Sequence, residues 1–234
     1  MNGVAMENAT RLQHALLIAA LADGRSQFFR CKTGSVTQSL INSLLALGVA
    51  AIADPVAERI DVAGTGGYWP NSDAELDAGN SFPLACLLTA ACSIGRGQYT
   101  VSYDTGNLGD APLVPLLSAL VDLRASVVHD VADDGRMVIN VGPGAIRGGT
   151  IRLPMGCPPA VLESLLIVAP YATDDVMIEA RNATHSAIEH LIPLMETFNV
   201  SVLEDAGRFI IAAPQRYRGR ELDDAMVASR HLRT

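Results

Sequence analysis

The sequence predicts an α/β fold in which three β-α-β-α-β-β repeats form a single pseudo-threefold domain. Three stretches are apolar on nearly every side and read as buried helices, and each precedes a short strand and a hairpin pattern. The second helix of each repeat ends at Leu47, Leu123 or Phe198, about 75 residues apart. Such a repeat unit cannot bury its apolar faces alone. We therefore expect the helices at the centre and the sheets outside.

The first repeat, at about residues 10–63, opens with an apolar helix. HALLIAALADG, residues 14–24, forms this helix and its glycine stop. SQFFRC, residues 26–31, is predicted to be a strand, and residues 37–47 a second helix. VAAIA and RIDVA then read as a hairpin.

The second repeat, at about residues 78–142, follows the same order. SFPLACLLTAACSIG predicts the buried helix, QYTVSY the strand and PLVPLLSALVDL the second helix. SVVHD and MVINV predict the hairpin that closes the repeat.

The third repeat, at about residues 150–213, carries the clearest helix signals. Pro158 and Pro159 suit a helix start, because the first-turn N–H groups have no intrahelical partner to lose. VMIEA predicts a strand, and Thr184 or Ser186 can cap the next helix. VSVLED and RFIIAA, joined around Gly207, predict the last hairpin.

The remaining segments are predicted to lie outside the repeats. Residues 1–9 are expected to be an N-terminal tail and residues 218–234 a C-terminal tail around a domain at 10–217. Residues 64–77, GTGGYWPNSDAELD, are Gly-rich and polar, and we interpret them as a mobile connector rather than a substrate lid. GTGG is not a phosphate loop, because no Gly-Lys-Ser/Thr follows it.

Composition excludes several classes of function. The net charge of −8 argues against nucleic acid or an anionic membrane as the main partner. No stretch reaches the ~18 uninterrupted apolar residues that a membrane span needs. The four cysteines are widely spaced and form no Cys-x-x-Cys pair, so neither a metal site nor a disulfide framework is expected. With no secretion signal at the N-terminus, we expect a cytoplasmic protein.

Several phrases resemble one known family. They are HALLIAALADG, SLLALGV, LDAGNS, LIVAPYA and PLMETFNVSV. Together with the order of the repeats, they are similar to 5-enolpyruvylshikimate-3-phosphate (EPSP) synthase, over about residues 8–217. That family transfers an enolpyruvyl group from phosphoenolpyruvate to shikimate 3-phosphate in a cleft between two such domains. The resemblance covers only one of the two, so it implies a single-domain, diverged enolpyruvyl transferase homologue.

The charged positions that the resemblance would carry over are altered in this sequence. The family's opening Ser-Lys-Ser, with its catalytic lysine, corresponds to residues 8–10, Asn-Ala-Thr. A following arginine corresponds to His14, the acidic pair to residues 35–36, and the Arg-Pro to residues 111–112, Ala-Pro. Each charge-assisted contact is worth ~1.5–3 kcal/mol, so losing all of them makes the standard enolpyruvyl transfer improbable.

The polar loops of the family are altered as well. The loop that grips phosphoenolpyruvate is kept only as residues 79–81, Gly-Asn-Ser, before Phe82. The Ser-Ser-Gln that holds shikimate 3-phosphate corresponds to residues 158–160, Pro-Pro-Ala. The serine and basic residue before the last helix correspond to residues 184–185, Thr-His.

These correspondences give the candidate site residues, and no metal or cofactor is expected. The substrate-binding candidates are Thr10, His14, Asn80, Ser81 and Thr184, and the catalytic candidates are His185 and Cys157. Histidine can act as an acid or base near neutral pH, and a cysteine at a helix start can become a thiolate. The six helices are expected to start on one face, where their free N–H groups attract an anion. The alternative interpretations are structural. Each capping residue then satisfies the N–H groups of its own helix only, and Cys157 is a small buried apolar residue.

Two functions follow from these residues. In the first, the chain is an enzyme of specialised or shikimate-related metabolism that performs transfer or elimination chemistry on a small carboxylated or phosphorylated ring. In the second, it is a non-catalytic binding or partner subunit. In either case we expect the helix-start face to be covered by a second copy in a homodimer, or else by a separate partner protein.

Overall fold

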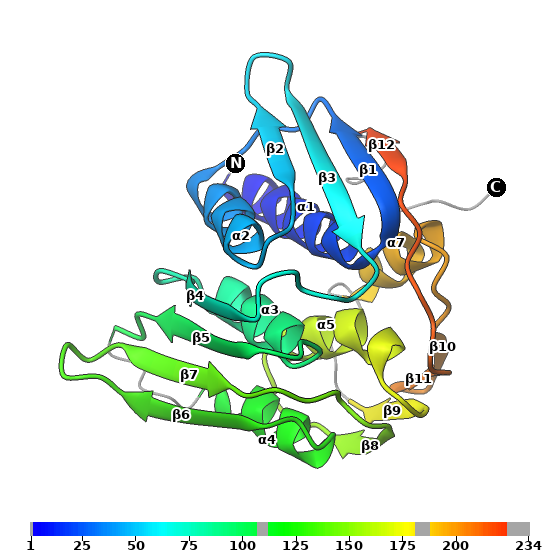
Figure 1. Cartoon of the computed structure of the whole chain (residues 1–234). Coiled ribbons are helices and arrows are strands. Elements are labelled where there is room, and N and C mark those ends of the chain that lie inside the picture. Colours follow the sequence, from blue (N-terminus) through cyan, green and yellow to red (C-terminus); the bar gives the residue numbers. More distant parts are fainter. Residues whose placement is uncertain (1, 107–111, 181–187, 224–234) are drawn as a thin grey trace.

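The computed structural model describes residues 2–106, 112–180 and 188–223, with side chains from Ala9 onward (Figure 1). The helices are α1 (Asn2–Leu21), α2 (Ser35–Ala46), α3 (Phe82–Cys92), α4 (Val114–Asp122), α5 (Pro159–Val168), the 3₁₀ helix η1 (Ala169–Tyr171) and α7 (Leu191–Thr197). The strands are β1 (Asp23–Phe29), β2 (Ala51–Asp54), β3 (Arg59–Thr65), β4 (Asp73–Asp77), β5 (Gln98–Tyr103), β6 (Val127–Val131), β7 (Met137–Val141), β8 (Gly149–Arg152), β9 (Val176–Glu179), β10 (Leu203–Asp205), β11 (Arg208–Ile211) and β12 (Glu221–Asp223).

The strands form three four-stranded sheets with one shared topology. Their orders are β12-β1-β3-β2, β4-β5-β7-β6 and β8-β9-β11-β10. In each sheet the first pair is parallel and the other two pairs are antiparallel. The predicted three β-α-β-α-β-β repeats with pseudo-threefold symmetry are therefore confirmed.

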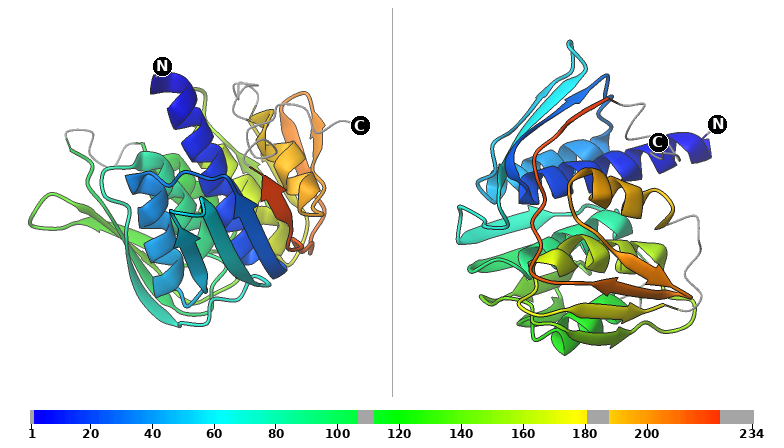
Figure 2. Two further views of the ribbon diagram at one scale, coloured as in Figure 1. Left: turned by 90° about the horizontal axis from the view of Figure 1, so that it is seen from above. Right: turned by 90° about the vertical axis from the view of Figure 1, so that its right-hand side faces the viewer.

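The core lies between the three sheets and is built from the first helix of each repeat. Buried runs occupy residues 15–22, at the end of α1 and just beyond it, residues 84–92 of α3 and residues 160–168 of α5. Alanine, leucine, isoleucine and cysteine dominate these runs, so they bury apolar surface on every side. In Figure 2 the sheets lie outside these helices, as the sequence predicted. Within the described part of the chain, no helix has the length and apolar character that crossing a bilayer requires.

The structure differs from the predicted tails at both ends. Helix α1 begins at Asn2, inside the stretch 1–9 that was expected to be a tail. Residues 221–223, expected in the C-terminal tail, form β12 and complete the first sheet by pairing in parallel with β1, Phe28 opposite Leu222. Leu222 is 2% exposed, so burial of its side chain explains why the end of the chain returns to the first repeat.

The predicted mobile connector at residues 64–77 is also corrected. It is neither a mobile connector nor a lid, because its end forms β4, which pairs in parallel with β5. Trp69 is 2% exposed, and its indole N–H donates to the carbonyl of Ala91 on α3 at 2.9 Å. Gly95 leaves room for this ring, since a Cβ there would lie 2.9 Å from Cδ1 of Trp69. The stretch is a packed connection between the first two repeats.

The Trp69 anchor gives the first prediction. Trp69→Ala should reduce the free energy of unfolding by about 3–5 kcal/mol, because it leaves a cavity and an unpaired carbonyl. Urea denaturation followed by circular dichroism measures this change. The matched control is Tyr68→Ala, whose side chain is 55% exposed and should cost little. Equal reductions of the free energy of unfolding in the two variants would show that burial of Trp69 does not stabilise this connection.

Candidate functional site

The candidate site is formed by the loops that follow the parallel strands and lead into helices. The carboxyl ends of parallel strands meet at the same edge of a sheet, so the loops that follow them are neighbours. We call residues 30–34, 78–81, 104–106 and 153–158 the helix-start loops. In the second sheet the N–H of Asp104 donates to the carbonyl of Gly79 at 2.7 Å, which joins two of these loops directly.

The same pairing recurs in the other two sheets. In the third sheet, the N–H of Leu153 donates to the carbonyl of Glu179 at 2.9 Å, just beyond the paired strands β8 and β9. In the first sheet, Arg30 after β1 forms an ion pair with Asp223 at the end of β12. In each sheet, the segments that leave the two parallel strands therefore lie side by side.

The loop 78–81 is held rigidly by Asp77. Its Oδ1 accepts from the backbone N–H of Gly79 at 2.8 Å, and it also contacts the guanidinium of Arg136. Desolvation opposes ionisation of this carboxyl, but the bonds from Gly79 and Arg136 prevail and lower its pKa. Gly79 has φ +58°, which glycine adopts without strain. Asp77 thus fixes the entry to α3.

Two predicted site residues lie in this loop. Ser81 is the N-cap of α3 and accepts from the N–H of Leu84 at 3.4 Å, so the predicted helix start is confirmed. Asn80 is exposed beside it. Their role in binding a substrate stays a prediction. Thr10, another predicted substrate-binding residue, lies within α1 and not at the start of a helix.

Cys157 lacks the activation that was predicted for it. Helix α5 begins at Pro159, and the half-buried Cys157 precedes its N-cap, Pro158. Burial raises the pKa of the Cys157 thiol to about 11, so the thiol is protonated at neutral pH. Its Sγ lies 3.8 Å from the carbonyl oxygen of Pro158. The geometry therefore supports a neutral thiol and not a thiolate nucleophile.

His14, predicted to bind substrate, is instead part of a buried cluster. It is 1% exposed, and its Nδ1 lies 3.2 Å from Nε2 of His190. Its Nε2 lies 3.6 Å from Oε2 of Glu163, which is longer than a hydrogen bond. The two imidazole planes are within 3° of parallel, and the ring centroids are 5.4 Å apart. A side chain enclosed in this way cannot meet a ligand at the surface.

Burial sets the charge state of this cluster. Desolvation, followed by the nearby His190, lowers the pKa of His14 to about 3. Desolvation raises the pKa of the Glu163 carboxyl to about 7. Sequence reasoning missed Glu163 and His190, although a glutamate within an otherwise apolar buried helix was a usable signal.

The predicted residues Thr184 and His185 lie outside the described residues, so their placement in the site stays a prediction. In the described part of the chain, no group of three or more His, Cys, Asp or Glu side chains is arranged to hold a metal ion.

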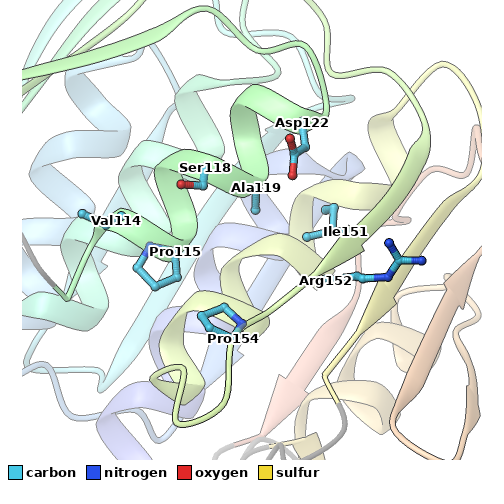
Figure 3. A pocket seen from close by; sticks show the side chains of 8 residues that line it. All are labelled: Val114, Pro115, Ser118, Ala119, Asp122, Ile151, Arg152 and Pro154. Carbon is cyan, nitrogen blue, oxygen red and sulfur yellow. The ribbon is translucent and has the colours of Figure 1, made fainter.

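A shallow pocket lies between α4 and the strand β8 (Figure 3). Its volume is about 160 Å³, below the ~300–1,000 Å³ of typical ligand sites. Arg152 lines it, but its guanidinium Nε donates to Glu179 at 3.1 Å, and Asp122 adds a negative charge. By itself this pocket does not suit a ring-sized anion.

Comparison with known proteins identifies the family. The family described as EPSP synthase (3-phosphoshikimate 1-carboxyvinyltransferase) matches residues 8–228. The chain belongs to the EPSP synthase family. The 3-phosphoshikimate 1-carboxyvinyltransferase of Trichormus variabilis is 29% identical over 209 residues, which cover 88% of this chain and 49% of that protein. The same enzyme of Shewanella sp. is 30% identical over 207 residues, covering 87% and 48%. The chain thus spans about half the length of these relatives.

Solved structures show the same fold. An EPSP synthase from Acinetobacter baumannii superposes with a TM-score of 0.77 at 16% identity, over 91% of this chain and 47% of that one. The enolpyruvyl transferase NikO from Streptomyces tendae gives a TM-score of 0.64 at 13% identity, over 92% and 49%. The expected fold, one domain of the EPSP synthase-like fold, is therefore confirmed.

The protonated state of Cys157 gives the second prediction. At pH 8, alkylation of Cys157 by iodoacetamide should be at least tenfold slower than that of a free thiol of pKa ~8.5, because the thiolate is the nucleophile. Mass spectrometry across pH 7–11 gives the rate, and Cys157→Ser identifies the reacting site. Cys31, Cys86 and Cys92 are buried and should remain unlabelled in the folded chain. Rapid labelling of Cys157 at pH 7 would contradict the neutral thiol.

Proposed function

We propose that this chain is a diverged enolpyruvyl transferase-family domain that binds a small carboxylated or phosphorylated ring at its helix-start loops. In this proposal the domain does not carry out the standard enolpyruvyl transfer by itself. Family membership supports transferase chemistry, and the altered charged positions argue for a changed reaction.

One observation carries this proposal: described cations around the helix-start loops already have acidic partners. Arg30 pairs with Asp223, and Arg136 pairs with Asp77. Arg152 pairs with Glu179 at 3.1 Å. A neighbouring carboxylate offsets part of the attraction between such a cation and a doubly charged phosphate ester. At the position of the family's catalytic lysine stands Ala9, which offers no charge at all.

An anion would then be held by dipoles rather than by ion pairs. The start of α3 presents the positive end of the helix dipole, beside the exposed Asn80. Such sites suit a single carboxylate better than two phosphates, because each dipole contact is worth about 0.3–1 kcal/mol. In this proposal, Thr184 and His185 supply further polar contacts and the acid–base group.

A second candidate, a non-catalytic partner subunit, is supported by apolar side chains near the loops. Met155, within the helix-start loops, is 79% exposed, and Val114, at the start of α4, is 41% exposed. The neutral thiol of Cys157 also removes one expected nucleophile. Exposed apolar surface at a site edge favours an interface, and a second copy of this chain is the simplest occupant.

The missing charges give the third prediction. The purified chain should release no phosphate from phosphoenolpyruvate and shikimate 3-phosphate, and it should not complement a strain that lacks the synthase. A full-length synthase provides the positive control in both assays. Turnover by this chain alone would contradict the proposed change of reaction.

The exposed apolar side chains give the fourth prediction. At micromolar concentration, light scattering should report about twice the 24.7 kDa of one chain, because a dimer buries Met155 and Val114. Met155→Glu should shift the equilibrium towards the monomer, whereas Val56→Glu, at a fully exposed hairpin position, should not. A mass near 24.7 kDa at every dilution would rule out the homodimer.

A further inference from the structure

The buried cluster of His14, Glu163 and His190 joins three parts of the chain that are far apart in sequence. His14 lies on α1, Glu163 on α5, and His190 directly before α7. Their exposed fractions are 1%, 6% and 8%, so bulk water reaches none of them freely. A buried ionisable group is costly unless it is neutral or paired, so the proton count of the cluster bears on the stability of this junction.

Few other titratable groups face the cluster in the described residues. On α3, Cys86 interacts with Glu163 and with Cys157, and burial raises the pKa of both thiols, which keeps them neutral. Arg11 lies one turn before His14 on α1 and has interactions of its own. The carboxyl of Glu163 and the imidazole of His14 are thus the groups in this cluster whose pKa values burial shifts in opposite directions.

We propose that His14, Glu163 and His190 form a buried neutral cluster, called the latch below, in which folding moves one proton from the imidazolium of His14 to the carboxylate of Glu163. In the unfolded chain the pair is charged, as imidazolium and carboxylate. In the folded chain both groups are neutral, and the proton count of the pair is unchanged. This inference concerns the fold and does not depend on the proposed function.

The contacts determine which nitrogen atom of His14 carries the hydrogen in the folded chain. With Glu163 protonated, Nε2 of His14 carries the lone pair that faces the carboxyl at 3.6 Å. Nδ1 of His14 then carries the hydrogen and donates to Nε2 of His190 at 3.2 Å. His190 therefore holds the ring of His14 in the orientation that faces Glu163. A second proton would place an unpaired charge inside the junction of α1, α5 and the start of α7.

The two pKa shifts have opposite effects on stability. For Glu163 the pKa is raised from 4.5 to about 7, so its contribution is fully present below pH 4.5 and is lost as pH rises through about 7. For His14 the pKa is lowered from 6.5 to about 3, so its contribution is present above pH 6.5 and is lost as pH falls through about 3. Between about pH 4.5 and 6.5 the two slopes cancel, because the pair holds one proton in both states.

Two single variants test this cancellation, which is the fifth prediction. In Glu163→Gln the carboxyl that offsets the slope of His14 is lost, so the unfolding equilibrium constant should fall about tenfold more per unit rise in pH than in the wild type, between pH 4.5 and 6.5. In His14→Gln the carboxyl of Glu163 remains without this offset, so the constant should rise about tenfold more per unit rise in pH over the same range. Urea unfolding at several pH values gives these slopes. Slopes equal to that of the wild type in both variants would overturn the latch.

A control variant and an independent measurement accompany these two variants. His129→Gln, at an exposed position of β6, is the matched replacement of a histidine outside the cluster. If a cluster variant fails to fold, ¹⁵N-histidine NMR of the folded wild-type chain provides the same information. The imidazole of His14 should then stay neutral from pH 7 down to pH 4.5. Titration of His14 near its unperturbed pKa of ~6.5 would overturn the proposal.

Discussion

The fold depends on one constraint, which is that three helices with no polar face must be enclosed on all sides. Nine consecutive residues of α3, from Leu84 to Cys92, are buried, and the central runs of α1 and α5 are similar. No single sheet can cover such a helix, because a sheet buries only one side of it. Three sheets around three helices solve this problem, and the repeat of β-α-β-α-β-β units supplies them at equal intervals. The first sheet is completed only when the chain returns to it with β12.

Much of this arrangement could be predicted from the sequence, because apolar helices and β-branched hairpins carry strong periodic signals. The parallel edge strands β4, β8 and β12 were missed, since DAELD, GTIR and ELD are short and largely polar, and only their pairing partners make them strands. The start of the site at Ser81 was predictable from its capping chemistry. The enclosure of His14 was not, because its contacts, Glu163 and His190, come from elements distant in sequence.

The same constraint explains where polar chemistry occurs in this chain. With the centre filled by apolar helices, ligand-binding groups are confined to the ends of helices and to the loops that start them. Beside these loops, Asp77 accepts from the N–H of Gly79 and pairs with Arg136, and Asp223 pairs with Arg30. The domain keeps the scaffold of the EPSP synthase family. In the function proposed above, the helix dipoles of the described loops hold the anion. Glu163 and His14 are buried exceptions to this rule, and burial favours the neutral form of both groups.

The central claim is that the helix-start loops are the ligand site, and amide chemical-shift mapping tests it most directly. The ¹⁵N-labelled chain would be titrated with shikimate, a ring carboxylate, up to millimolar concentration. The account predicts saturable shifts at Asn80, Ser81 and the loop 153–158, with the outer hairpins unaffected. Shifts confined to the pocket between α4 and β8, or no shifts for shikimate and a panel of related ring carboxylates and phosphates, would contradict it.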